Sequence, residues 1–207
     1  AYAWPEVESF VTAVADHEGL GQALDLGCGN GRHTELLAEY GADAIGVDVS
    51  RGLLSAAATR QREHGFAAAL VQGDAATLPF ADATVDQIVY VATLHHLRPE
   101  ATRRQSLAAL GRLLRPGGLA LVSAWSTAHD RFDAETSFDT TVEWTLPGGE
   151  TVDRYYHIYD PDAFRAALNA VESIEPLVVT VSSGNCYGIV TTADSDATPD
   201  WPVGSVL

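Results

Sequence analysis

The stretch of sequence that decides the fold reads Ala23-Leu24-Asp25-Leu26-Gly27-Cys28-Gly29-Asn30-Gly31. Residues 22–26 form a short, mostly apolar run typical of a buried strand, and the three alternating glycines that follow are typical of a tight loop. Such a loop brings the backbone close to a ligand and presents amide donors at the start of the next helix. Because several nucleotide-binding folds share a GxGxG loop, its neighbours must decide between them.

Around the loop, the apolar pattern alternates between strand and helix spacing. It predicts helices over 4–17, from the loop to about 40, 51–64 and 100–114, and strands over 22–26, 44–47, 67–71, 85–91 and 119–124. Pro116-Gly117-Gly118 is expected to stop the last of these helices. Strands that alternate with helices form a parallel sheet, so the expected fold class is α/β.

The remaining chain reads as an insertion followed by the end of the same domain. Residues 127–159 are expected to form an insertion over the ligand end of the sheet, with a hairpin of strands 141–146 and 152–158 around Pro147-Gly148-Gly149. A short helix over 161–169, β-rich runs over 175–181 and 185–192, and a flexible tail over 195–207 follow. The 207 residues, 46% hydrophobic, predict one domain, residues 1–207.

The charge balance is strongly acidic. The chain has 28 acidic and 12 basic residues, a formal charge of -16, and every basic residue is an arginine. Such a surface argues against a polyanionic partner. A halophilic host is an alternative explanation, because molar salt screens charges within about 3 Å.

Compartment and metal content follow from what the sequence lacks. It has no signal-peptide pattern and no apolar run of the roughly 18 to 20 residues that cross a bilayer, so we expect a cytoplasmic protein without a membrane partner. Cys28 and Cys186 lie far apart and are expected to be free thiols, with no metal site in this chain. The absence of methionine predicts that further residues precede Ala1.

Three positions favour a sulfonium cofactor over a dinucleotide. Arg32 stands where a dinucleotide fingerprint has its third glycine. Asp48, 19 residues beyond Gly29, ends the second strand, where a carboxylate can accept both ribose hydroxyls or, alternatively, cap a helix. Asp74, in Gly73-Asp74-Ala75, can receive an adenine edge or form an Asx turn.

Four separated motifs together resemble class I S-adenosylmethionine-dependent methyltransferases. They are the Asp-x-Gly-x-Gly loop, the acidic end of strand two, Gly73-Asp74 and Leu114-Arg115-Pro116-Gly117-Gly118, spanning about 20–125. The resemblance implies a Rossmann-like, seven-stranded, mostly parallel sheet with helices on both faces. It also implies S-adenosyl-L-methionine as cofactor, bound by Asp25, Gly27, Cys28, Gly29, Asn30, Gly31, Asp48, Val49, Asp74, Ala75 and Val91.

Less generic segments are similar to a narrower family, the methyltransferases that esterify 5-carboxymethyluridine at the tRNA wobble position. The segments are residues 3–10, 24–31, 95–97, Arg154-Tyr155-Tyr156-His157-Ile158-Tyr159 and Gly184-Asn185-Cys186-Tyr187. The resemblance implies tRNA as substrate and a heterodimer with a small zinc-binding activator protein. Residues 66–71, a short uncharged edge strand, are the expected contact; the alternative is an edge covered by the chain's own helices. Together with the composition, this points to a haloarchaeal member.

Candidate catalytic residues lie beyond the cofactor loops. Arg154 is expected to grip an acceptor carboxylate or phosphate, or alternatively to pair with one of the many acids. His157 and His96 are expected to line the pocket with it. Of the adjacent pair His95 and His96, one is expected to be structural. A carboxylate acceptor, with a pKa of about 4, needs no general base. A hydroxyl or ring-nitrogen acceptor would use His96 or His157 as base.

Three functions remain open from the sequence. The first is the tRNA carboxyl methyltransferase with its activator, the second a small-molecule methyltransferase, and the third a non-catalytic cofactor-binding subunit. An arginine cluster in and around one helix faces tRNA, faces a partner or balances local acids; its members are Arg98, Arg103, Arg104, Arg112 and Arg115.

Overall fold

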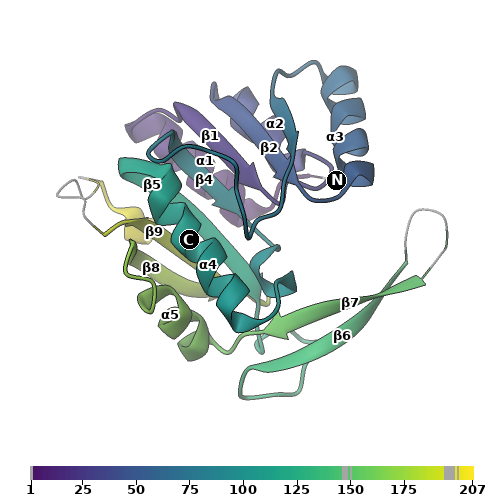
Figure 1. Cartoon of the computed structure of the whole chain (residues 1–207). Coiled ribbons are helices and arrows are strands. Elements are labelled where there is room, and N and C mark those ends of the chain that lie inside the picture. The colour runs from purple at the N-terminus through teal and green to yellow at the C-terminus, as the bar shows by residue number, and fades with distance from the viewer. Residues whose placement is uncertain (1, 146–148, 150, 194–198, 200) are drawn as a thin grey trace.

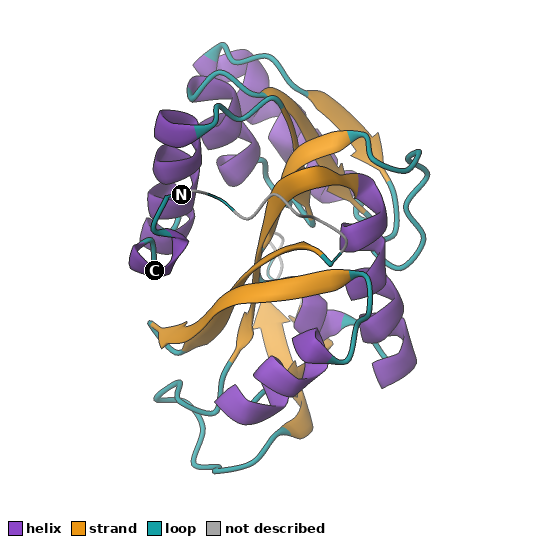
Figure 2. Ribbon diagram, turned by 90° about the vertical axis from the view of Figure 1, so that its left-hand side faces the viewer, coloured by secondary structure: helices purple, strands orange, loops and turns teal. Residues whose placement is uncertain are grey.

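A seven-stranded sheet runs through the molecule, with helices on both of its faces (Figures 1 and 2). The computed structural model describes residues 2–145, 149, 151–193, 199 and 201–207. The strand order is β3-β2-β1-β4-β5-β9-β8. β9 pairs antiparallel with β5 and β8, and the other neighbouring strands pair in parallel. The predicted Rossmann-like α/β fold is thereby confirmed.

The strands of this sheet follow the expected order along the chain. They are β1 (Gln22–Leu26), β2 (Asp43–Asp48), β3 (Ala69–Gln72), β4 (Val85–Tyr90), β5 (Leu114–Trp125), β8 (Ile174–Ser182) and β9 (Asn185–Thr192). The strands β3, β2, β1, β4 and β5 pair in parallel, so their carboxyl ends lie at the same edge of the sheet. This is the edge where open α/β sheets bind ligands.

Two apolar cores lie on opposite faces of the sheet. Neighbouring residues of β4 divide between them, Ile88 packing into one core and Val89 into the other, because successive side chains alternate across a strand. The core with Val89 holds α1 (Pro5–His17) and α2 (Arg32–Glu39), and that with Ile88 holds α4 (Glu100–Leu113) and α5 (Pro161–Asn169). α3 (Arg51–His64) lies beside β2 and β3. Within the described residues, no helix is long and apolar enough to cross a membrane.

Two expected boundaries differ in the structure. The edge strand begins at Ala69 and not at 66 or 67. Helix α4 ends at Leu113, and Pro116-Gly117-Gly118 lies inside β5. Pairing with β4 begins at Leu114 and then shifts register, because Gly118 passes so close to β4 that a Cβ would lie 2.7 Å from the Asp86 carbonyl oxygen. The glycines therefore shape a bulge in the strand and do not stop the helix.

The predicted hairpin is present between β5 and α5. It consists of β6 (Phe138–Thr145) and β7 (Thr151–Ile158), which form a separate two-stranded sheet reaching away from the body (Figure 1). Residues 146–148 and 150, where the turn was expected, lie outside the described residues. At its base, Val142, Tyr156 and Ile158 form a small core of their own with Trp125 and Phe138.

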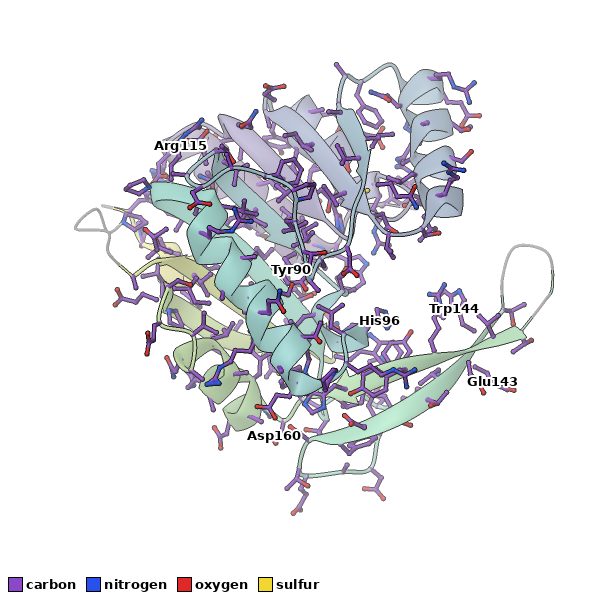
Figure 3. The ribbon with its side chains drawn as sticks, in the orientation of Figure 1. Tyr90, His96, Arg115, Glu143, Trp144 and Asp160 are labelled. Atoms are coloured by element: carbon purple, nitrogen blue, oxygen red, sulfur yellow. The ribbon has the colours of Figure 1, made fainter. Side chains whose placement is uncertain are left out.

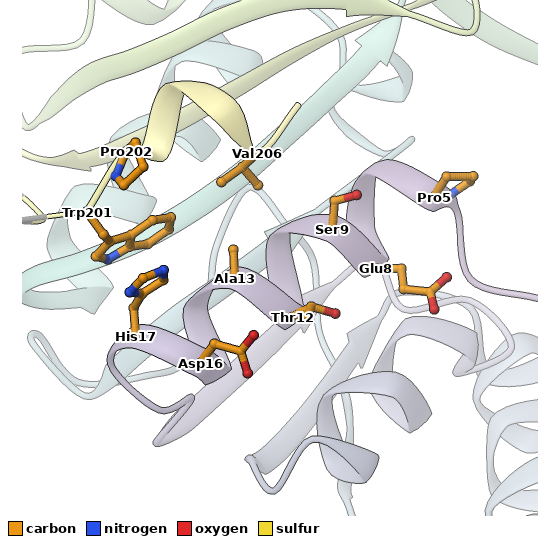
Figure 4. Close-up of a pocket in the computed structure, with 10 residues that line it drawn as sticks. All are labelled: Pro5, Glu8, Ser9, Thr12, Ala13, Asp16, His17, Trp201, Pro202 and Val206. Carbon is orange, nitrogen blue, oxygen red and sulfur yellow. The ribbon is translucent and has the colours of Figure 1, made fainter.

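The end of the chain packs against α1 where a flexible tail was expected. The Trp201 ring stacks on His17 with centroids 4.9 Å apart, and its Nε1–H donates to Glu18 at 2.7 Å (Figure 4). Trp201 and Val203 are both 7% exposed and belong to the core of α1. A groove of about 580 Å³ lies between α1 and these residues. Residues 201–207 are therefore part of the domain, while 194–198 and 200 lie outside the described residues.

Candidate active site

The glycine loop joins β1 to α2 at the carboxyl edge of the sheet. Gly27, Gly29 and Gly31 have φ angles of 77°, 55° and 79°, a region that favours glycine. A Cβ on Gly27 would lie 2.0 Å from Thr93 Oγ1, whereas a Cβ on Gly29 would meet no atom within 4 Å. Gly29 thus borders open space, and a ligand can approach the backbone there.

Asp48 fixes the middle of that loop. Its Oδ2 accepts the Gly29 N–H and its Oδ1 accepts the Ser50 N–H, both at 2.8 Å. Ser50, and not Asp48, caps α3, because its side chain accepts the Leu53 N–H. A carboxylate has about four acceptor positions, so Asp48 can still accept from ribose hydroxyls while it holds the loop.

Asp25 near the end of β1 and Cys28 in the loop are both buried. Asp25 is 1% exposed and its Oδ2 accepts the Thr34 hydroxyl at 2.6 Å, so it ties β1 to α2 beneath the loop. Burial raises the pKa of Asp25 to about 7, against the lowering effect of Thr34. Cys28 is also buried, and burial raises the pKa of its thiol. The structure therefore gives Asp25 and Cys28 a positioning role, and leaves the backbone of Gly29 and Asn30 to face a cofactor.

The neighbouring loops offer a flat apolar surface and a carboxylate. Val49, just after β2, is 66% exposed, and its carbonyl accepts the Gln72 side chain at the end of β3. Asp74 Oδ1 accepts the Ala76 N–H at 2.9 Å, the Asx turn that the sequence left open, and the described residues place no partner on Oδ2. Ala75 is 8% exposed. Val49 offers an apolar surface, and Asp74 an acceptor, that could receive the face and the edge of an adenine ring.

The chain after β4 turns sharply beneath the glycine loop. Val91 is 5% exposed, and Ala92 has a φ of 55°. The Ala92 N–H donates to Ser123 Oγ on β5, and Thr93 lies against Gly27. Val91 itself packs into the core of α1 and α2, and its carbonyl accepts the hydroxyl of Thr93, the residue that lies against the glycine loop.

The two adjacent histidines in the short 3-10 helix η1 (Leu94–His96) have different roles. His95 is 1% exposed, and its Nδ1 accepts the Trp125 N–H at 3.0 Å. Burial holds the pKa of His95 well below its usual value, so it is a neutral structural residue. His96 is half-buried, and its Nδ1–H donates to the Tyr155 carbonyl at 3.0 Å, which leaves the Nε2 lone pair free in the neutral ring. Burial also lowers the pKa of His96.

Arg154 and two aromatic rings share one face of the hairpin. The Tyr156 ring contacts His96 and stacks on Trp125, with centroids 4.4 and 4.7 Å away. Arg154 comes next along that face, with its guanidinium 4.8 Å from the Trp144 ring centroid. Among the ion pairs of the described residues, no carboxylate pairs with Arg154. Arg154 also hydrogen-bonds the Tyr156 side chain, and no carboxylate of the described residues occupies the rest of its planar fork of donors.

His157 lies on the other face of the same hairpin. Its Nδ1 bonds to Asp139 Oδ1 at 2.6 Å, and the Tyr155 hydroxyl donates to the same oxygen at 2.9 Å. Arg103 donates in turn to the Tyr155 hydroxyl. The expectation that His157 and Arg154 line one pocket is thus corrected, because residues three apart on a strand point to opposite faces.

The arginine cluster serves mainly internal contacts. Arg103 is 6% exposed and also donates to the Leu97 carbonyl. Arg112 donates to Phe80 and Leu78 carbonyls and to Asp82, and Arg115 pairs with Asp86. Arg98 lies over the Tyr155 ring at 5.4 Å, and Arg104 is exposed. Of the three alternatives, the contacts favour the balancing of local groups.

The sequence analysis assigned no site role to three aromatic residues that lie beside Arg154 and His96. Trp125, Tyr156 and Trp144 come from the end of β5 and from both hairpin strands. Their signal was present in the period-two pattern, since Tyr156 is two residues from Arg154. No three histidine, cysteine, aspartate or glutamate side chains in the described part of the chain are grouped so as to hold a metal ion.

The order of the strands in the mostly parallel sheet, with a glycine loop after β1 and a carboxylate at the end of β2, defines the class I S-adenosylmethionine-dependent methyltransferase fold. Residues 24–122 match the family model described as a methyltransferase domain. The match covers just under half of the chain, and together with the strand order it supports an S-adenosylmethionine-dependent methyltransferase, a class whose cofactor is S-adenosylmethionine. A methyltransferase structure from Clostridium acetobutylicum superposes with a TM-score of 0.73 at 16% identity, covering 90% of each chain.

The chain is similar to methyltransferases named for different substrates. An Arabidopsis thaliana tRNA (carboxymethyluridine(34)-5-O)-methyltransferase is 28% identical over 150 residues, which cover 70% of this chain and 34% of that protein. A ubiquinone biosynthesis O-methyltransferase of Methylococcus capsulatus is 38% identical over 102 residues, 49% of this chain and 42% of the relative. The chain thus spans less than half the length of either relative.

Proposed function

We propose that this chain is the catalytic domain of a tRNA methyltransferase that esterifies a carboxymethyl group on a wobble uridine. The observation that carries the proposal is Arg154, whose charge no carboxylate of the described residues neutralises. It lies on the hairpin face that also carries Tyr156 and Trp144, here called the site face. The chain has only 12 basic residues against 28 acidic ones, so most arginines have acids available to pair with, and Arg154 differs from them. Its use for a carboxylate acceptor agrees with the similarity to the Arabidopsis enzyme.

The chemistry asks for positioning more than for acid–base catalysis. S-adenosylmethionine, when bound, supplies an activated methyl group on a sulfonium. Arg154 orients the acceptor carboxylate through its donor fork, and Asp48 holds Gly29 so that the loop keeps its shape. The stacked rings of Tyr156 and Trp125 exclude water from the acceptor side. A carboxylate is already ionised at neutral pH and needs no base.

His96 separates this proposal from the alternative, a small-molecule O- or N-methyltransferase. The identity to the Methylococcus O-methyltransferase is the observation that favours the alternative. In that case the free Nε2 of His96 would accept a proton from a hydroxyl. His96→Gln would then abolish turnover and flatten the pH profile, whereas a carboxylate acceptor predicts a modest loss with an unchanged profile between pH 6 and 9.

We also propose a small zinc-binding activator as partner, docked by strand addition on the segment 66–71. The support is that β3 pairs with β2 alone in the described sheet, and that the segment carries no charged side chain. Ala69 and Gln72 on this strand are exposed. A charge at the exposed Ala69, Ala69→Glu, should weaken the complex without affecting cofactor binding.

The test is transfer of labelled methyl groups to tRNA isolated from a strain that lacks the gene, with the partner present. We expect label in tRNA that mild base releases as methanol, because esters are base-labile and methyl ethers or methylamines are not. Arg154→Ala should lose most of this activity, Arg154→Lys should keep part of it, and the exposed Arg104→Ala should keep all of it. Label only in small-molecule pools would support the alternative, and cofactor binding without turnover would indicate a non-catalytic subunit.

A further inference from the structure

Trp144, on β6, is an exposed indole beside the acceptor side of the site. Its side chain is 45% exposed, although burying a tryptophan normally stabilises a fold. The strand register pairs Trp144 with Val152 and Val142 with Arg154, so Trp144 and Arg154 are diagonal neighbours on one face. The guanidinium covers one side of the ring at 4.8 Å and leaves the rest to solvent.

The same hairpin face leads from the site to Trp144 in a continuous row. Tyr156, 3% exposed, is stacked at the base, Arg154 is half-buried in the middle, and Trp144 is exposed nearest the tip. Figure 3 shows Trp144 rising on the side of the hairpin where His96 lies, while Glu143 points away from it. A flat molecule leaving the acceptor site along the hairpin would therefore meet the Trp144 ring.

The two faces of the hairpin differ in charge. On the face away from the site, Glu143 lies directly opposite Asp153, a like-charge pair, and Asp139 follows along β6. On the site face, Arg154 is the charged residue, between Val142, Val152 and Trp144. Near the base of the far face, Arg98 and Arg103 contact Tyr155 and His157 bonds to Asp139, so the unbalanced acids of that face are Glu143 and Asp153, toward the tip. Close to the tip, an anionic strand is therefore repelled from the far face and attracted to the face that carries Arg154.

We propose that Trp144, backed by Arg154, is a stacking platform for an unpaired nucleobase that neighbours the methylated nucleotide. The inference rests on the proposed function and names how the RNA strand is held. Bases stack on aromatic side chains in single-stranded loops, at about 1–3 kcal/mol per base. Arg154 suits both tasks, because its planar face contacts the indole while its in-plane donors reach a carboxylate or phosphate.

The test compares an anticodon stem-loop RNA that carries 5-carboxymethyluridine with the free modified nucleoside. For Trp144→Ala we expect KM for the stem-loop to rise about tenfold with kcat unchanged, and no change toward the nucleoside. Trp144→Phe should keep most of the affinity. Tyr2→Ala, which removes an aromatic ring that is 95% exposed at the other end of the chain, is the matched control and should change nothing.

Stem-loop affinity in the presence of S-adenosylhomocysteine, measured by fluorescence anisotropy, separates this inference from the proposed function. A wild type that binds but does not methylate the stem-loop would overturn the proposed function, and a tenfold weaker Trp144→Ala would still support the platform. An unchanged affinity and KM in Trp144→Ala would overturn the platform. So would an equal loss toward the nucleoside, or a loss confined to binding of a protein partner.

Discussion

The carboxylate of Asp48 accepts the backbone N–H of Gly29 at 2.8 Å, across the 19 residues that separate them. The bond ties the end of β2 to the glycine loop after β1, two parallel neighbours in the sheet. One side chain therefore both shapes the loop and presents acceptor positions toward a ribose. Cofactor affinity should depend on this carboxylate more than on any other acid of the chain.

Asp48→Asn is expected to weaken S-adenosylhomocysteine binding by about ten- to a hundredfold. The amide keeps one acceptor oxygen and loses the charge, and hydrogen bonds to charged groups contribute roughly 1.5–3 kcal/mol. Isothermal titration calorimetry measures the change. Asp43→Asn, at the exposed start of the same strand, is the control. Equal affinities of wild type and Asp48→Asn would contradict the assignment.

Gly29→Ala should lose cofactor affinity out of proportion to stability. Gly29 and Gly41 have φ angles of 55° and 87°, and a Cβ at either position meets no atom within 4 Å. Both alanine variants should therefore lose about 1–2 kcal/mol of folding stability from backbone strain. Only Gly29→Ala should also weaken binding, because its Cβ would occupy the space a cofactor needs. If Gly41→Ala reduced affinity as much, Gly29 would not face the ligand.

Asp25 should make stability fall with rising pH. Its folded-state pKa of about 7 lies above the usual 3.8, so the folded state holds a proton that the unfolded chain has released. This stabilisation is complete below pH 3.8 and is lost as pH rises through 7. Buried His33, with its pKa lowered to about 3 from 6.5, acts oppositely, since its contribution is lost as pH falls. The two effects oppose each other between pH 4 and 6.5.

Denaturant unfolding across pH 4 to 7 isolates the Asp25 contribution. In Asp25→Asn the free energy of unfolding should rise with pH more steeply than in wild type, by up to about 1.4 kcal/mol per pH unit. Thr34→Val removes the hydroxyl that lowers the pKa of Asp25, so the window should move to higher pH. Identical slopes in wild type and Asp25→Asn would show that Asp25 does not titrate in this range.

High salt should stabilise the fold if the acidic surface reflects a halophilic host. The net charge of -16 repels itself in dilute buffer, and molar salt reduces the range of that repulsion to about 3 Å. The midpoint of thermal unfolding should therefore rise when the KCl concentration is raised about thirtyfold, from about 0.1 to about 3 M. Glu143→Gln, which removes one member of a like-charge pair with Asp153, should stabilise in dilute buffer and have no effect in molar salt. Full stability and activity without salt would contradict the hypothesis.

Helix boundaries were predictable from the sequence where a capping residue or a glycine determines them. The bounds of α3 follow from the Ser50 cap and from Gly65, whose φ is 76°, and those of α5 follow from the Asp160 cap. The carboxyl-end placement of Asp48 and Asp74 follows from the parallel sheet. Trp201 could not be placed this way, because its partners Glu18 and His17 lie more than 180 residues earlier in the chain.

The acceptor side was predictable only in part. Arg154 and His96 are both neighbours of Tyr156, a ring that stacks on Trp125 from another strand. The alternation of β7 already placed His157 on the opposite face, with Tyr155. What the sequence lacked was the position of α4, whose Arg103 draws Tyr155, Asp139 and His157 into a separate network.

Methyl esterification of tRNA is tested most directly by nucleoside mass spectrometry of tRNA from cells with and without the gene. We expect deletion to remove the methyl ester of 5-carboxymethyluridine and to leave the free carboxylate form in its place, with restoration by wild type and not by Arg154→Ala. An unchanged nucleoside profile on deletion would contradict it.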